Sequence, residues 1–96
     1  MDSLHKADWT FLSNHAHVLI YISKFQESRI RDVADAVGIT ERFAQKILKD
    51  LEDAGYLTSS RQGRRKSYEV VQGLKFRHPL EEGAEISQLL SIFSDK

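Results

Sequence analysis

The chain has 96 residues, of which 14 are basic and 14 acidic, so its formal net charge is zero. This length predicts a single domain over residues 1–96 with a thin hydrophobic core. Zero net charge argues against bulk electrostatic adhesion to nucleic acid, although a local basic patch can still attract a ligand. The absence of cysteine excludes disulfides, thiolate zinc sites and cysteine nucleophiles. The longest apolar run, Val18–Ile22, is too short for a membrane span, and a cytoplasmic location is expected.

The first predicted element is a helix over Thr10–Phe25, which either Ser13 or Asn14 can cap. Its apolar side chains point in nearly all directions, so it should be buried on more than one side, and one side could face another subunit. A second, shorter helix is predicted over Ile30–Val37, where the apolar residues form one stripe at helical spacing.

A helix-turn-helix is predicted where the second helix ends at Gly38, because glycine reverses the chain at little steric cost. Thr40 is then a suitable N-cap for a third helix, Glu41–Ala54, which Gly55 terminates. The core side of the third helix is a stripe of Ala44, Ile47, Leu48 and Leu51.

A β-hairpin should follow, with strands at Tyr56–Ser59 and Ser67–Val71 and a turn at Gly63. This spacing predicts a loop longer than two residues, with RQGRRK at its tip. A last helix is predicted over Leu80–Phe93, entered near Pro79. Its apolar stripe, which could cap the core or form a two-fold seam, consists of Ile86, Leu89, Leu90 and Phe93.

The outer face of the third helix, opposite its core stripe, carries Arg42, Gln45, Lys46 and Lys49. Arginine can bind guanine through O6 and N7, glutamine can bind adenine, and lysine can reach guanine or phosphate. The N-terminal turn of such a helix lies nearest the bases, so Lys49 is expected at phosphate instead. The simpler interpretation is that any surface helix has a charged outer face, and Asp50 and Asp53 beside these residues disfavour phosphate.

The predicted hairpin tip concentrates four basic residues, Arg61, Arg64, Arg65 and Lys66. A basic loop is often only solvated. If it contacts a duplex, each phosphate that it neutralises should steepen the salt dependence of binding by about 0.9 in log–log slope. Either Arg64 or Arg65 could instead enter a narrow minor groove.

The stretch IRDVADAVGITERFAQKILKDLEDAGYL, followed by the hairpin YLTSSRQGRRKSYEV, resembles winged helix-turn-helix bacterial transcriptional regulators of the MarR-like type. A group of short, single-domain regulators shares related patterns, which here occupy Leu12–Leu19, Val37–Leu57, Gly63–Tyr68 and Arg77–Glu81. The resemblance covers residues 9 to about 93. It implies a mainly α fold with a small β-hairpin: a three-helix core within residues 10–78, a wing and a C-terminal helix over 80–93.

The resemblance also implies functional residues and partners. Phe43 departs from the small residue expected at its position, and it lies at the edge of the core, where packing is the alternative to base contact. A homodimer on a palindromic or near-palindromic duplex is implied as well. By position, the implied recognition residues are Thr40, Glu41, Arg42, Gln45 and Lys46, and the implied wing residues are Arg61, Arg64, Arg65 and Lys66.

The function expected from these observations is sequence-specific binding of double-stranded DNA as a transcriptional regulator. Helix 41–54 would read the major groove, and wing residues 61–66 would hold the flanking backbone or minor groove. Dimerisation is expected through the first and last helices, since most soluble oligomers are two-fold dimers. The alternative is a winged-helix module that binds protein, with the basic wing against an acidic partner.

Chemistry of other kinds is not expected. The sequence shows no arrangement of serine, histidine and acid for a nucleophile and no glycine-rich phosphate loop, so neither an enzyme nor a cofactor is predicted. His15 and His17 diverge on one helix and cannot share a metal ion, so no metal site is predicted. His15 should instead be a buried, hydrogen-bonded residue beside Asn14 or part of a subunit contact.

Overall fold

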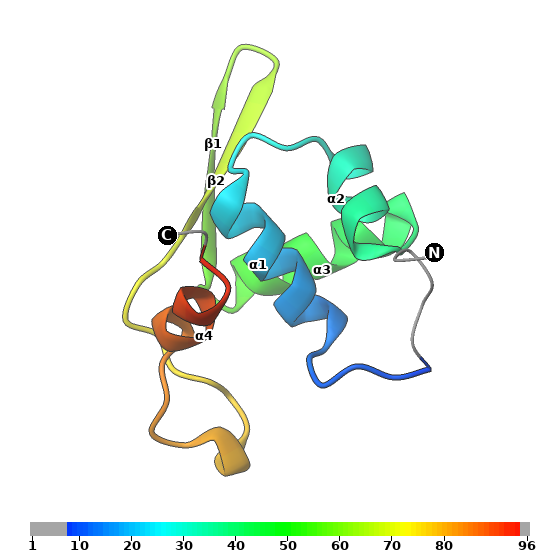
Figure 1. Ribbon diagram of the computed structural model, residues 1–96. Helices are drawn as coiled ribbons and strands as arrows, with labels where there is room; N and C mark the ends of the chain where they lie inside the picture. Colours follow the sequence, from blue (N-terminus) through cyan, green and yellow to red (C-terminus); the bar gives the residue numbers. More distant parts are fainter. Residues whose placement is uncertain (1–7, 95–96) are drawn as a thin grey trace.

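The computed structural model describes residues 8–94 and shows a mainly α fold with one small β-hairpin (Figure 1). None of the helices within these residues is long and apolar enough to cross a membrane. The elements follow the predicted order and are α1 (Asn14–Lys24), α2 (Ile30–Val37), α3 (Glu41–Asp53), β1 (Leu57–Gln62), β2 (Arg65–Val70), a 3-10 turn η1 (Pro79–Glu81) and α4 (Ile86–Ile92).

Helix α1 begins four residues later than predicted, at Asn14 instead of Thr10. Ser13 has an extended backbone, with ψ of 167°, so the helix cannot continue through it toward the N-terminus. Its hydroxyl oxygen accepts a hydrogen bond from the Ala16 amide at 3.2 Å, which selects Ser13 over Asn14 as the cap.

The helix-turn-helix forms as the sequence predicted. Gly38 has φ of 88°, in the left-handed region, and its amide donates to the Ala34 carbonyl at 2.8 Å. The Thr40 hydroxyl then accepts from the Phe43 amide at 3.0 Å and starts α3. Gly55, with φ of 89°, follows the end of α3.

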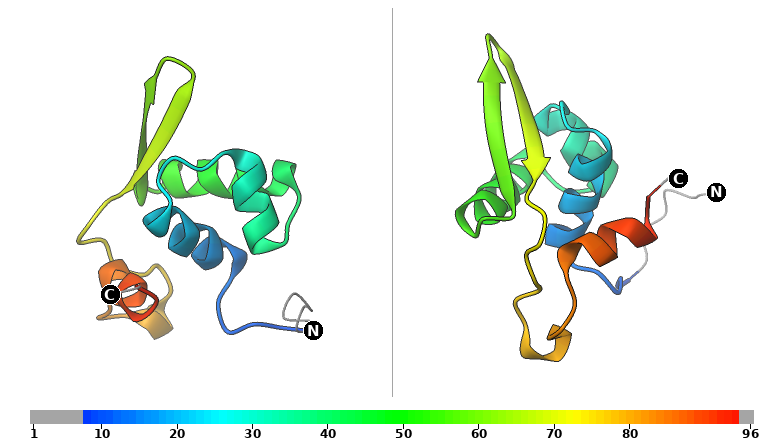
Figure 2. Two further views of the ribbon diagram at one scale, coloured as in Figure 1. Left: turned by 45° about the horizontal axis from the view of Figure 1, so that its top comes forward. Right: turned by 90° about the vertical axis from the view of Figure 1, so that its left-hand side faces the viewer.

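The hydrophobic core lies where α1, α2 and α3 meet, and the base of the hairpin closes it. Figures 1 and 2 show the three helices packed together, with the hairpin projecting away from them. All four residues of the predicted α3 stripe are buried, which fixes the opposite face of α3 toward solvent. The buried residues are Val18, Leu19, Ile22, Val33, Ala34, Ala44, Ile47, Leu48, Leu51, Tyr56, Leu57, Tyr68 and Ile86.

The hairpin of residues 57–70, called the wing below, is longer and more tightly turned than predicted. Gln62 pairs with Arg65 across the antiparallel strands, so only Gly63 and Arg64 form the turn, and the prediction of a longer loop was wrong. Gly63 has φ of 63°, as a type II′ turn requires at its first central residue. The polar residues near the tip concealed the strands, because both faces of the projecting tip are exposed and no apolar alternation is needed there.

The predicted continuous helix over Leu80–Phe93 was also wrong. It is broken into η1 and α4, with Gly83 at φ of 92° between them. The Ile86 amide donates to the Leu74 carbonyl at 2.9 Å, which anchors the start of α4 beside the preceding connector. Ile86 is buried and Leu90 packs against the core, whereas Phe93 is 40% exposed, so only part of the predicted stripe caps the core.

Candidate functional site

The predicted outer face of α3 lies in solvent. Its four residues, Arg42, Gln45, Lys46 and Lys49, are all exposed. The side chains of Arg42 and Gln45 form no hydrogen bond or ion pair with any residue between 8 and 94. Two polar groups with planar, paired hydrogen-bonding geometry are therefore available to an external partner at the start of this helix.

The two lysines of this face are paired with acids one turn further along α3. Lys46 Nζ lies 3.2 Å from Asp50 Oδ1, and Lys49 Nζ lies 3.4 Å from Asp53 Oδ2. Such exposed pairs contribute about 0–1 kcal/mol, so each lysine can exchange its carboxylate for another anion at small cost. The i,i+4 spacing of both pairs is visible in the sequence and could have revealed them.

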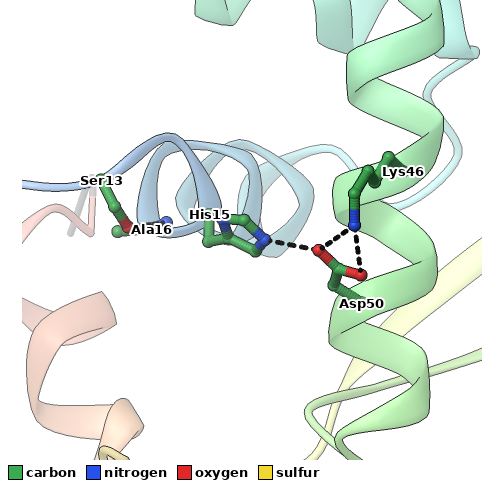
Figure 3. A network of polar contacts seen from close by, with 5 residues as sticks. All are labelled: Ser13, His15, Ala16, Lys46 and Asp50. Atoms are coloured by element: carbon green, nitrogen blue, oxygen red, sulfur yellow. Dashed lines mark hydrogen bonds and ion pairs between the residues drawn. The ribbon is translucent and has the colours of Figure 1, made fainter. Parts of the chain in front are cut away.

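Asp50 also connects α3 to α1 (Figure 3). His15 Nε2 lies 2.9 Å from Asp50 Oδ2, and both side chains are partly exposed, at 44% and 37%. His15 is hydrogen-bonded, as expected, but it is only partly buried and its partner is Asp50, whereas Asn14 contacts His17, at 3.3 Å. Hydrogen bonds from His15, and next from Lys46, lower the pKa of Asp50 below its ordinary value of 3.8.

This pKa shift predicts a pH-dependent contribution to stability. Because the carboxylate is favoured in the folded state, its stabilisation is present above pH 3.8 and is lost as pH falls through the lower, folded-state value. Urea unfolding of Asp50→Asn and the unchanged protein between about pH 2 and 6 should show a stability difference that shrinks toward acid. Asp53→Asn is the matched control, because Asp53 also follows a lysine by one turn and has no histidine partner. A difference that stays constant across this range would contradict the prediction.

The first turn of α3 contains the other predicted recognition residues. Thr40 already uses its hydroxyl oxygen in the helix cap, although its proton remains available to a partner. Glu41 Oε2 lies 3.9 Å from Arg31 Nε on α2, which joins the two helices of the helix-turn-helix. Phe43 is 39% exposed and lies outside the buried core.

The four basic residues of the wing differ in their surroundings. Arg65 Nη1 lies 2.9 Å from Glu27 Oε1, and Lys66 Nζ lies 5.3 Å from the centre of the Tyr68 ring. Arg61 and Arg64 have no side-chain partner within the described part of the chain. The structure thus leaves two wing arginines uncompensated and neutralises a third, a distinction that sequence analysis missed because Glu27 lies 38 residues from Arg65.

No group of three or more histidine, aspartate or glutamate side chains within residues 8–94 could hold a metal ion. His15 and His17, the pair that sequence analysis considered, bond to different residues, Asp50 and Asn14.

Neither known family descriptions nor curated protein sequences match this chain. Solved structures do match. ZitR of Lactococcus lactis, in complex with DNA, superimposes with a TM-score of 0.55 at 22% identity over 69% of this chain and 47% of ZitR. The chain therefore spans about half the length of that neighbour.

Two further structures match over more of the chain. The homodimeric winged helix-turn-helix DNA-binding domain of Mb0332 from Mycobacterium bovis has a TM-score of 0.56 at 18% identity, covering 85% of this chain and 65% of that one. AdcR of Streptococcus pyogenes has a TM-score of 0.59 at 18% identity, covering 90% and 59%. AdcR is a zinc-dependent MarR family transcriptional regulator, and a structure of its Zn(II)-bound state also matches this chain. The chain consists of three helices, a hairpin and a C-terminal helix, and it has the winged helix-turn-helix fold of these transcriptional regulators.

Proposed function

We propose that this protein binds double-stranded DNA with sequence specificity and acts as a transcriptional regulator. The observation that carries the proposal is the outer face of α3, where Arg42 and Gln45 are exposed and unpaired within residues 8–94. In a helix-turn-helix, the start of the second helix enters the major groove. Arg42 then suits guanine, and Gln45 suits adenine.

The lysines of α3 serve the phosphates in this proposal. Lys46 exchanges Asp50, and Lys49 exchanges Asp53, for a phosphate oxygen when the duplex arrives. Both exchanges replace one exposed ion pair with another, so they cost little free energy. Thr40 and Glu41 lie at the same end of α3, where the helix amides also favour a phosphate.

The wing holds the flank of the same duplex. Arg61 and Arg64 are exposed and uncompensated by any described residue, and Lys66 lies opposite Arg61 in the cross-strand register. These positive charges suit the phosphate backbone or a narrow minor groove. ZitR, which has the same fold, is known in complex with DNA, and this supports the assignment.

The protein acts as a homodimer in this proposal, through surfaces that include α1 and α4. The segments around these helices expose large apolar side chains: Trp9, Phe11, Leu80, Ile92 and Phe93. An apolar hollow of about 230 Å³ lies between α1, the end of α3 and the C-terminal segment. Mb0332, a homodimeric neighbour, supports this arrangement. To read two successive major grooves, such a dimer would need its two α3 helices about 34 Å apart.

A second candidate is a winged-helix module that binds an acidic protein. The exposed ring of Phe43 beside Arg42 favours it, since aromatic residues and arginine are enriched in protein interfaces. A DNA-reading helix has less use for an apolar ring at this position, although the ring can contact a thymine methyl group.

Selection from a pool of random duplexes at about 150 mM salt tests the proposal. The expected result is enrichment of a palindrome or near-palindrome, because two copies of α3 read two half-sites. Arg61→Ala/Arg64→Ala should weaken the enrichment, whereas Lys75→Ala, an exposed lysine outside α3 and the wing, should not. No enrichment, with no binding at low salt either, would instead direct the search to acidic protein partners.

A further inference from the structure

The strand register of the wing divides its basic residues between two faces. Residues directly opposite each other in an antiparallel pair project from the same face. Arg61 lies opposite Lys66, and Gln62 lies opposite Arg65. Because side chains alternate along a strand, Arg61 and Lys66 share one face and Arg65 lies on the other.

The face that carries Arg61 and Lys66 is the one turned toward the helices. Two positions along the strands, on the same face, lie Ser59 and Tyr68. Tyr68 is buried in the core, and the Ser59 hydroxyl donates to Glu52 Oε2 of α3 at 2.6 Å. Arg61 and Lys66 therefore extend the side of the wing that faces α3, and the cation–π contact of Lys66 with Tyr68 agrees with this placement.

Arg65, on the opposite face, is joined to the connection between α1 and α2. Its guanidinium lies 2.9 Å from the Glu27 carboxylate. The neighbouring residue Gln26 accepts a backbone hydrogen bond from the Tyr68 amide, also at 2.9 Å. One side-chain contact and one backbone contact thus attach strand β2 to two consecutive residues of this connection, which runs beside the wing in Figure 1.

We propose that Arg65 is a positioning residue, which holds the wing at its angle to α3 through Glu27, and that only the other three basic residues of the wing, Arg61, Arg64 and Lys66, meet the duplex. This inference rests on the proposed DNA-binding function and refines it. The Arg65–Glu27 ion pair lies near the projecting end of the wing. The Tyr68–Gln26 hydrogen bond lies three residues closer to the core. The ion pair therefore restricts the tip, which the core does not otherwise hold.

The size of the effect is limited by the ion pair itself. Arg65 and Glu27 are 72% and 60% exposed, and pairs of this kind contribute little to folding. Variants of either residue should consequently fold. The gain in DNA affinity from a prepositioned wing cannot exceed the free energy of the pair, so its loss should weaken binding by at most about fivefold for each subunit.

Salt-dependent DNA binding distinguishes positioning from direct contact. Arg61→Ala and Lys66→Ala should each reduce the log–log salt slope by about 0.9 per subunit, as expected for a lost phosphate contact. Arg65→Gln should weaken binding without that change in slope. Glu27→Gln should weaken it too, even though this variant removes a negative charge near DNA. The double variant Glu27→Arg/Arg65→Glu restores the ion pair with its charges exchanged. It should recover most of the affinity that Glu27→Gln or Arg65→Gln loses.

Two results would overturn the inference. Tighter binding by Glu27→Gln would mean that Glu27 competes with phosphate for Arg65. A loss of about 0.9 in slope with Arg65→Gln would identify Arg65 itself as a phosphate contact.

A protein that binds no duplex would overturn the proposed function separately. In that case, residual dipolar couplings of the wing amides relative to those of α3 decide the positioning role. A changed wing orientation in Glu27→Gln supports it, and an unchanged orientation overturns it.

Discussion

Arg42→Ala is expected to weaken binding of the dimer to its selected duplex by about 2–6 kcal/mol, because each subunit loses a base contact of about 1–3 kcal/mol. Arg42 is exposed in the first turn of α3 and its side chain forms no hydrogen bond or ion pair within residues 8–94, so its removal leaves no described acid unpaired. Folding should be unaffected, and the loss should be confined to binding. Fluorescence anisotropy with the selected and a scrambled duplex measures both affinities.

The pattern across duplexes is as informative as the size of the loss. Arg42→Ala should reduce the preference for the selected duplex over the scrambled one, since it removes a contact with a base. Lys49→Ala is the matched control on the same helix. This replacement should weaken binding to both duplexes alike and reduce the salt slope, as the loss of a phosphate contact does. If Arg42→Ala reduced the affinity for both duplexes equally, Arg42 would contact the DNA backbone instead of a base.

Ile47→Ala is expected to reduce the free energy of unfolding by about 2–5 kcal/mol. Ile47 has no exposed surface and lies in the middle of α3, where it packs into the core shared with α1 and α2. The truncation removes buried apolar volume and leaves a cavity that this small core can fill only partly. A loss of this size is a large fraction of the roughly 5–15 kcal/mol that stabilises a typical domain.

Urea unfolding followed by circular dichroism measures this loss. Gln45→Ala is the control, because it lies two residues away on the exposed face and should change stability by less than about 0.5 kcal/mol. The two replacements should therefore affect different properties: Ile47→Ala reduces stability, whereas Gln45→Ala weakens DNA binding alone. Equal stability losses would show that α3 does not present one face to the core and the other to solvent.

The local elements were predictable because their signals lie within a few residues of one another. Gly38 and Thr40 define the turn between α2 and α3, and the structure confirms both the left-handed glycine and the threonine cap. The apolar stripe of α3 likewise determined which face is buried, and with it the exposure of Arg42 and Gln45.

Predictions failed where distant parts of the chain decide the outcome. The extent of the wing strands was underestimated, because the exposed tip carries no apolar alternation to reveal them. The break between η1 and α4 was missed, because the start of α4 is held by the connector at Leu74 and not by helical periodicity alone.

By itself, the sequence determined the helix-turn-helix, the polar face of α3 and the basic character of the wing. Their physical basis is local: side-chain spacing, a cap and a glycine conformation. Only the tertiary structure decided which of the wing arginines is compensated, and that Asp50 joins α3 to α1. Arg65 meets Glu27 across 38 positions, and Asp50 meets His15 across 35, so neither pair has a periodic signature. Exposed ion pairs also contribute too little to folding to impose a pattern on the sequence, and they form wherever packing of the core brings the charges together.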